Sequence, residues 1–428
     1  MTFRLLSKNL QYFITSLVFA LITHVTVAQT QTAQVELGID VLEQNKFQLL
    51  QGKRVGLLTH PAGVNRHGVS TIEVLRKSKY VNLVALFGPE HGIYGNEAAN
   101  TPVENRTDKR TGLPVYSLYG QYRKPTPEML KGLDVMVVDL QDLGVRSYTY
   151  ISCLLYVMEA CFEQNVEVVV LDRPNPLGGL KVDGPMMERE WMSYVGAYNI
   201  PYVYGLTIGE LARWAKSTPG STMLRKGLDR KGKLQVVTMR NWKRSMLWTD
   251  TGLPWVPTSP NIPDFAAAIG YSITGLGSQI GGFQHGIGTD YPFRLLSYPG
   301  KSSDDILNAL LDRQIDGLGF KIIEYKDRRG KMNTGVYVLI DDWQKLKPTE
   351  LSFNMMQLTC EWSLGNPFKE ASKNDIELFN KHVGSSAWLT ELKTRGERAR
   401  VKYFVERWAR DARKFQAQTE RFWLYPKN

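Results

Sequence analysis

The sequence predicts an α/β protein in which a Rossmann-like domain with a parallel sheet precedes a smaller α+β domain. Three apolar runs, VALFG, VMVVD and VVVLD, each end in a polar or glycine-rich turn. Near-continuous apolar strands are typical of parallel sheets that are covered on both faces. Further along, GFKIIEY and GVYVLIDD alternate apolar and polar residues and are followed by helical patterns, which indicates the α+β part.

In the first domain, expected strands and helices follow one another. RVGLL precedes a loop and a helix from Ser70, NLVALFG and DVMVVDLQ are strands, a helix spans 148–164, and VEVVVLD is the next strand. Thr207 caps a later helix with Glu210 completing a capping box. Residues 94–127 show weak periodicity and are expected to form a long loop over the ligand cleft at the carboxyl ends of the strands. The βαβ alternation predicts a doubly wound sheet.

Proline density rises in PWVPTSPNIPDF, and we place the domain boundary there. The first domain then spans residues 36–256 and the second spans 257–428. Three helices are expected in the second domain, near 349–361, 373–381 and 397–417.

The first residues have the layout of a signal peptide. Arg4 and Lys8 precede an apolar stretch, and small residues end at Ala28, so residues 1–28 are the expected signal with cleavage before Gln29. The alternative is an uncleaved anchor, but the apolar core is short for a membrane span. We therefore expect an exported protein, periplasmic or secreted, with no stable membrane insertion after cleavage.

Bulk properties limit the class of protein. A chain of 428 residues with 43% hydrophobic and 22% charged residues is long enough for two globular domains. The net charge of +11 suits an anionic polymer outside the cytoplasm, and we expect no nucleic-acid partner. Cys153 and Cys161 lie about 12 Å apart along one expected helix, too far for a disulfide, so all three cysteines are expected as buried thiols.

Several common motifs are absent from the sequence. The turn THPAGVNRHG carries no G-x-G-x-x-G pattern, and there is no Walker loop, G-x-S-x-G or H-E-x-x-H. His60, His67, His91 and His285 match no compact metal-ligand spacing. We expect neither a metal nor an organic cofactor.

The expected strand ends carry the chemistry, because ligands of open α/β sheets bind beyond the carboxyl ends of the strands. In GPEHG, the flanking glycines leave Glu90 and His91 open to a ligand. A sheltered glutamic acid can donate a proton to a leaving oxygen. The alternative is that Glu90 bonds a turn or pairs with Arg106 or Arg110.

DLQDLGVRSYTYI places Asp139 at a strand end, Asp142 in the turn, Arg146 before the helix and Tyr148 near its start. A second carboxylate facing Glu90 would give the two-acid arrangement of glycoside cleavage. In the alternative interpretation the aspartates bond helix amides and Arg146, which we favour for Asp139 but not for Asp142.

DRPNPLGG places Asp172 and Arg173 at the next strand end. The planar guanidinium of Arg173 suits a substrate carboxylate, and the alternative is an Asp–Arg brace of a rigid loop. His285 and Thr289 lie in a glycine-rich loop of the second domain that would close the cleft from the other side.

With these stretches, the chain resembles the exo-β-N-acetylmuramidase (NamZ) family. The matching pieces run in order from about residue 38 to 294 and are GLLTHPAGV, LFGPEHGIYG, TGLPVYSLYG, VVDLQDLGVRSYTYI, LDRPNPLGG and GTDYPF. The resemblance implies a Rossmann-like catalytic domain, a smaller C-terminal domain and an active site between them. It also implies release of N-acetylmuramic acid from the non-reducing ends of peptidoglycan fragments, without a cofactor.

The family glutamate matches Glu90, the expected acid, and we choose Asp142 as base or electrostatic stabiliser from its position. Arg146 or Arg173 would hold the lactyl carboxylate of muramyl saccharides derived from peptidoglycan. The other residues expected to contact the sugar are His60, His91, Asp139, Tyr148, Asp172, Asn175, His285 and Thr289.

Two features keep other functions open. Ile287 stands where the family more usually has an arginine, and SYPGKSS replaces the usual G-A-P-W-like stretch. A non-catalytic muropeptide- or sugar-binding protein of the cell envelope is therefore the alternative. A metal-dependent hydrolase of a different bond is a second one.

Overall fold

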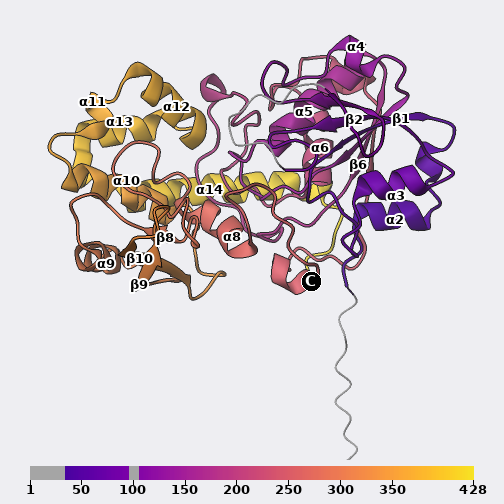
Figure 1. Ribbon diagram of the computed structural model, residues 1–428. Coiled ribbons are helices and arrows are strands. Elements are labelled where there is room, and N and C mark those ends of the chain that lie inside the picture. The colour runs from indigo at the N-terminus through magenta and orange to yellow at the C-terminus, as the bar shows by residue number, and fades with distance from the viewer. Residues whose placement is uncertain (1–33, 96–105) are drawn as a thin grey trace, which may run out of the picture. The chain divides into compact units, whose positions relative to one another are not determined.

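A seven-stranded sheet forms the centre of the first domain in the computed structural model, which describes residues 34–95 and 106–428 (Figure 1). The expected signal peptide lies outside these residues. The strands are β1 Arg54–Thr59, β2 Asn82–Gly88, β3 Arg106–Thr107, β4 Pro114–Ser117, β5 Val135–Asp139, β6 Glu167–Leu171 and β7 Leu234–Val237. Their order is β3-β4-β2-β1-β5-β6-β7, and only the β3–β4 pair is antiparallel.

Helices cover both faces of this sheet. The first-domain helices are α2 Gly38–Gln44, α3 Thr71–Lys77, α4 Pro127–Leu130, α5 Tyr150–Glu163, α6 Ile208–Ser217 and α7 Leu228–Lys231. Because side chains alternate along a strand, Val135 and Val137 pack in the core that contains α2 and α3, whereas Met136 and Val138 face α5. The predicted Rossmann-like parallel sheet is confirmed, including the Thr207–Glu210 capping box at the start of α6.

The stretch 94–127 differs from the expected long loop. It contains β3 and β4, and β4 extends the sheet by pairing in parallel with β2, with Val115 opposite Leu86. Residues 96–105 lie outside the described part. Strand β4 has four residues and begins with Pro114, so it carries too little periodicity to be recognised. Its partner β2 lies well before it in the chain.

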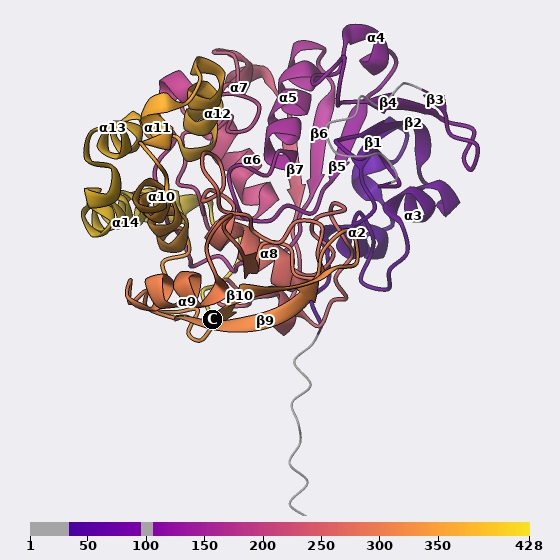
Figure 2. The same ribbon diagram turned by 60° about the vertical axis from the view of Figure 1, so that its left-hand side comes forward.

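The second domain is α+β, as predicted. Its strands β8 Leu295–Leu296, β9 Leu318–Lys326 and β10 Met332–Ile340 form an antiparallel sheet in the order β8-β10-β9 (Figure 2). Its helices are α8 Phe265–Thr274, α9 Ser303–Leu311, α10 Glu350–Trp362, α11 Pro367–Glu370, α12 Lys373–Val383, α13 Ser386–Arg395 and α14 Val401–Thr419. Short 3-10 turns span Gln48–Leu50, Arg189–Trp191, Trp248–Thr251, Gly396–Arg398 and Glu420–Phe422.

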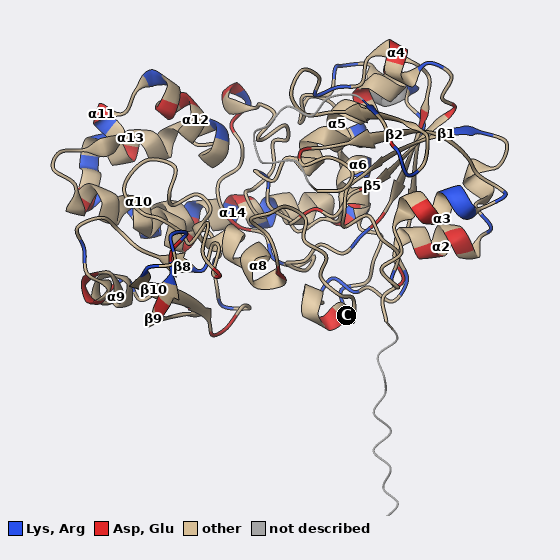
Figure 3. Ribbon diagram, viewed as in Figure 1, with Lys and Arg blue, Asp and Glu red and all other residues tan. Residues whose placement is uncertain are grey.

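An aromatic cluster forms the centre of the helical part of this domain. Phe353 of α10 lies between Trp388 of α13 and Trp408 of α14, with ring centroids 5.2 Å and 4.4 Å away. All three side chains are buried, so α14 docks through one apolar face. Lys and Arg are interspersed with Asp and Glu over both domains (Figure 3). In the described residues no helix is both long and apolar enough to cross a membrane.

After α14 the chain returns to the first domain. The Leu424 amide donates to Glu210 at 2.8 Å, and the Tyr425 hydroxyl donates to Asp172, 253 residues earlier, at 2.5 Å. Glu210 also forms a fully buried ion pair with Arg244 at 2.6 Å. The last described segment is therefore part of the first domain's core.

Candidate active site

The loops after β1, β2 and β5 bring together the central group of candidate residues. His60 follows β1, Glu90 and His91 follow β2, and Asp142 follows β5. Because these strands are parallel neighbours, their carboxyl ends meet at one edge of the sheet (Figure 2). The site expected at that edge is thus built from consecutive strand ends.

Glu90 lies among tyrosines. Its main-chain oxygen accepts a hydrogen bond from the Tyr150 hydroxyl at 3.3 Å, and the same hydroxyl donates to the oxygen of Thr258 at 2.9 Å. Burial raises the pKa of Tyr119, and the charge and a hydrogen bond of the Glu90 carboxylate raise it further. The Glu90 charge also contributes to the raised pKa of Tyr271, whose principal cause is burial. The Glu90 carboxylate is therefore bonded by the Tyr119 hydroxyl, and its main-chain oxygen by Tyr150.

The backbone at His91 is unusual. His91 has φ 71° and is buried, a conformation that costs energy for any residue other than glycine. The adjoining turn is tight, since a Cβ added at Gly88 would lie 3.1 Å from the amide of Ile93. Non-glycine residues held in this conformation cluster at functional sites, so the strain favours a functional role for the GPEHG turn.

His60 has one bonded ring nitrogen and one that finds no hydrogen-bond partner among the described residues. Its Nε2 accepts the Gln141 amide at 2.9 Å, which leaves the proton on Nδ1. Burial lowers the pKa of His60 well below its usual value, with the positive charge of Arg173 adding to the effect. The imidazole is therefore neutral, and its ring packs edge-on against Tyr150 at 4.8 Å.

Asp142 is a buried carboxyl group with an incomplete set of partners. Its Oδ2 accepts from the Tyr204 hydroxyl and, at 2.7 Å, from the Gly144 amide. Burial raises the pKa of Asp142 to about 7. Three buried polar atoms here find no hydrogen-bond partner in the structure, namely Asp142 Oδ1, His60 Nδ1 and Gln141 Oε1. Such atoms are satisfied by a bound ligand or by water.

The structure places Asp139 and Arg173 in a buried ion pair. The two contacts join Arg173 Nε to Asp139 Oδ1 at 2.5 Å and Nη2 to Oδ2 at 2.9 Å. Arg173 also donates to the oxygen of Val64 at 2.6 Å, and Thr71 donates to Asp139. Arg173 is thus paired with Asp139 of the preceding strand, and not with its neighbour Asp172 as in the brace considered as the alternative. These contacts favour a structural role over the predicted grip on a substrate.

Asp172 and Asn175 also make hydrogen bonds within the protein. Asp172 accepts from Thr207 at 2.7 Å and from the Gly209 amide at 2.8 Å, and burial raises its pKa to about 7. The Asn175 amide donates to the oxygen of Leu206 at 3.0 Å. The predicted contacts of these two residues with the sugar gain no support from their positions.

Arg146 has a different environment from the one expected. Its Nη1 donates to the oxygens of Pro185 at 2.7 Å and Ile200 at 2.8 Å, and its Nη2 to those of His382 at 3.0 Å and Val383 at 2.8 Å. The side chain is completely buried. Because its terminal nitrogens are occupied by main-chain oxygens, these contacts favour a structural role over binding of a lactyl carboxylate.

His285 and Thr289 lie together in the second domain. Both line a pocket of about 570 Å³ between the glycine-rich loop and the β9–β10 hairpin. Ring contacts connect this loop to the first domain, from His285 to Phe293 at 4.8 Å, from Phe293 to Tyr271 at 4.9 Å, and from Tyr271 to Tyr148 at 6.3 Å. The loop predicted to close the site from the second domain is therefore connected, through Phe293 and Tyr271, to Tyr148 just before α5.

Sequence reasoning missed several members of the site. They are Tyr119, Gln141, Tyr150, Tyr204, Thr258 and Tyr271. Tyr119 and Tyr150 lie inside matched motifs, TGLPVYSLYG and VRSYTYI, which is the signal that marks them. Across the described residues, no three His, Cys, Asp or Glu side chains gather as metal ligands.

Comparisons with known proteins agree with the motifs. The model of the exo-beta-N-acetylmuramidase NamZ N-terminal domain matches residues 55–266, and that of its C-terminal domain matches 269–425. The peptidoglycan beta-N-acetylmuramidase NamZ of Bacillus subtilis (strain 168) is 39% identical over 363 residues, which cover 82% of this chain and 85% of that protein.

Two solved structures have the same fold. Both are DUF1343 family proteins from Bacteroides fragilis NCTC 9343. One has a TM-score of 0.82 and 38% identity, covering 92% of this chain and 99% of that one. The other has a TM-score of 0.69 and 25% identity, covering 92% and 100%. With both domain models and a close relative matched, the chain belongs to the exo-β-N-acetylmuramidase NamZ family.

Proposed function

We propose that this protein is a glycoside hydrolase that releases N-acetylmuramic acid from the non-reducing ends of peptidoglycan fragments. The support is its family membership together with the position of Glu90 at the strand ends. The observation that carries the proposal is that the Glu90 carboxylate lies after a strand end and is bonded by the Tyr119 hydroxyl, a polar setting suited to an acid beside a sugar.

In the proposed reaction, Glu90 protonates the glycosidic oxygen as its bond to the anomeric carbon of N-acetylmuramic acid breaks, and water adds to that carbon and gives up a proton. Asp142 is the second acidic group and acts as base or electrostatic stabiliser. His60 donates from Nδ1 to the bound sugar. The free atoms Asp142 Oδ1 and His60 Nδ1 support this assignment, since a polar ligand satisfies both.

Replacing Glu90 with glutamine tests the assigned acid. We expect kcat/KM on a muramyl disaccharide to fall by about 10²–10⁴-fold, the usual contribution of a general acid. The loss on p-nitrophenyl β-N-acetylmuramide should be smaller, because nitrophenolate leaves without full protonation. Rates on the two substrates are compared by chromatography and by absorbance.

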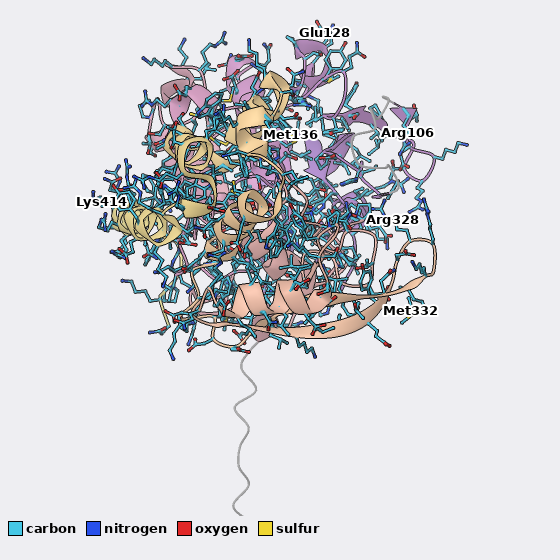
Figure 4. The ribbon with its side chains drawn as sticks, turned by 90° about the vertical axis from the view of Figure 1, so that its left-hand side faces the viewer. Arg106, Glu128, Met136, Arg328, Met332 and Lys414 are labelled. Atoms are coloured by element: carbon cyan, nitrogen blue, oxygen red, sulfur yellow. The ribbon has the colours of Figure 1, made fainter. Side chains whose placement is uncertain are left out.

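A matched control is Glu128→Gln, which removes the same charge at an exposed site in the first turn of α4 (Figure 4). Its rates should equal those of the wild type. Wild-type turnover of both substrates by Glu90→Gln would remove Glu90 as the acid. Tight binding of muramyl fragments by the unaltered protein without any product would favour the non-catalytic alternative.

We further propose that residues 1–28 direct export, on the basis of their charge and apolar pattern. The mature protein should begin at Gln29 and be recovered outside the cytoplasm. Amino-terminal sequencing of the protein from fractionated cells measures this, and a protein that retains Met1 in the cytoplasmic fraction would contradict it.

A further inference from the structure

The pocket of about 570 Å³ in the second domain has an uneven charge. The glycine-rich loop and the β9–β10 turn enclose it, and its polar lining includes Gln284, His285, Thr289, Tyr325, Arg328 and Arg329. Arg328 lies in the turn between β9, which ends at Lys326, and β10, which begins at Met332 (Arg328 and Met332 are labelled in Figure 4). The volume is within the range of small-ligand sites. A ligand of the size of one sugar or one amino acid therefore fits.

Two guanidinium groups and one carboxylate, that of Asp327, line this pocket, so positive charge is in excess by one. Among the described residues, the guanidinium groups of Arg328 and Arg329 make no hydrogen bond or ion pair. The Asp327 carboxylate makes its hydrogen bonds within the turn itself. It accepts from the amides of Arg329 at 2.9 Å and Lys331 at 3.0 Å and from Asn333 Nδ2 at 3.2 Å. The pocket thus presents two free guanidinium groups and one carboxylate that is already bonded within the turn.

The glycine-rich loop packs closely against Arg328. Gly288 has φ 87°, and a Cβ built there would lie 1.8 Å from Arg328 Nε. A residue without a side chain is therefore required for the guanidinium to lie against the loop. His285 adds no charge, because burial lowers its pKa to about 4 and the ring stays neutral. The positive charge of the pocket comes from the two arginines.

We propose that Arg328 and Arg329 bind a carboxylate of the muramyl substrate in this pocket. The inference rests on the proposed function, which supplies an acidic saccharide. A guanidinium binds a carboxylate through two parallel hydrogen bonds, and two of them favour an anion over a neutral sugar. Ring contacts run from His285, which lines the pocket, through Phe293 and Tyr271 to Tyr148 of the first domain.

Two parts of peptidoglycan carry this chemistry, the lactyl group of N-acetylmuramic acid and the stem peptide. Calorimetric titration distinguishes them with three probes, namely N-acetylmuramic acid, N-acetylmuramyl dipeptide and N-acetylglucosamine. In the dipeptide the lactyl carboxylate has become an amide and the free carboxylate lies on the peptide. N-acetylglucosamine has no carboxylate at all.

The variants are Arg328→Ala, Arg329→Ala, the double variant and Arg410→Ala. Arg410 is exposed on α14 and controls for the loss of one positive charge. We expect the double variant to bind one of the two acidic probes at least about tenfold more weakly, with each single variant intermediate. Binding of N-acetylglucosamine and all properties of Arg410→Ala should be unchanged. The probe that is weakened identifies the carboxylate.

Equal weakening of all three probes, or affinities that match those of Arg410→Ala, would overturn the proposal, as would the absence of binding of both acidic probes to the unaltered protein. Binding is measured without turnover, so a protein that fails to hydrolyse muramides still gives a decisive result. In that event the hydrolase assignment is wrong, and the titrations still decide whether the pocket binds a carboxylate.

Discussion

Three aspartates after neighbouring strand ends have different surroundings. Asp139 is neutralised by Arg173, Asp172 accepts hydrogen bonds from Thr207 and Tyr425, and Asp142 is buried with one free oxygen. All three follow an apolar run in the sequence. Their different environments come from residues distant in the chain, and these decide which carboxyl group is free to meet a ligand.

The pKa of Asp142 gives a testable pH dependence of stability. Burial raises this pKa from 3.8 to about 7, so between these values the folded protein holds a proton that the unfolded chain has lost. The free energy of unfolding therefore falls as pH rises through this window, and its contribution from Asp142 is fully present only below about pH 4. Asp142→Asn should flatten the decline by up to about 4 kcal/mol in urea denaturation between pH 4 and 7.5.

Asp134→Asn provides the control for this experiment. Asp134 is exposed, and its hydrogen bond with Arg54 lowers its pKa to about 2, so it is ionised throughout the tested window. Its replacement should leave the slope of stability against pH unchanged there. An unchanged slope in Asp142→Asn would show that Asp142 ionises normally in the folded protein.

The sequence placed three candidate site residues correctly relative to the strands. Glu90, His60 and Asp142 are brought to one edge of the sheet, because a strand end can be recognised from a local apolar run. The partners of each side chain were not predictable in the same way. Arg146 contacts residues up to 237 positions away, and no local pattern indicates such a contact.

At the scale of elements, long apolar strands and capped helices were predicted well. Strands β2, β5 and β6 and helices α5 and α6 lie where the sequence placed them. The short strands β3, β4 and β7 were missed. A strand of two to four residues is defined by its neighbours in the sheet, and its own residues carry almost no periodicity.

The last turn of helix α12 is bonded by the side chain of Arg146. The guanidinium binds the oxygens of His382 and Val383, in the last turn of α12, and so joins that helix to the first domain. Arg146→Met should leave buried main-chain oxygens without a donor and lower the free energy of unfolding by about 3 kcal/mol or more. Urea denaturation followed by tryptophan fluorescence measures the change.

Arg225→Met is the matched control for Arg146→Met. Arg225 is exposed and forms a surface ion pair with Glu163 at 2.5 Å, so its loss should change the stability by no more than about 0.5 kcal/mol. If Arg146→Met is as stable as this control, the contacts to α12 contribute nothing measurable to the fold.

For the whole molecule, the two predicted domains and their order were recognisable from periodicity and proline density. Their mutual dependence was not. The Arg244–Glu210 pair sits at the centre of the first domain, yet the Leu424 amide also binds Glu210 and Trp423 stacks on Arg244, with the guanidinium carbon 3.9 Å from the ring centroid. The hydrogen bond from Leu424 to Glu210 joins residues more than 200 positions apart, and no local sequence pattern predicts such a contact.

This returning segment has a consequence for biosynthesis. Asp172 receives Tyr425 only after a further 253 residues have left the ribosome, so the amino-terminal half cannot reach its final packing while translation continues. Until then Glu210 lacks the Leu424 amide and Asp172 lacks the Tyr425 hydroxyl, while Arg244, Thr207 and Gly209 already supply their other contacts. The last contacts of these two buried carboxyl groups therefore form only when synthesis of the chain is nearly finished.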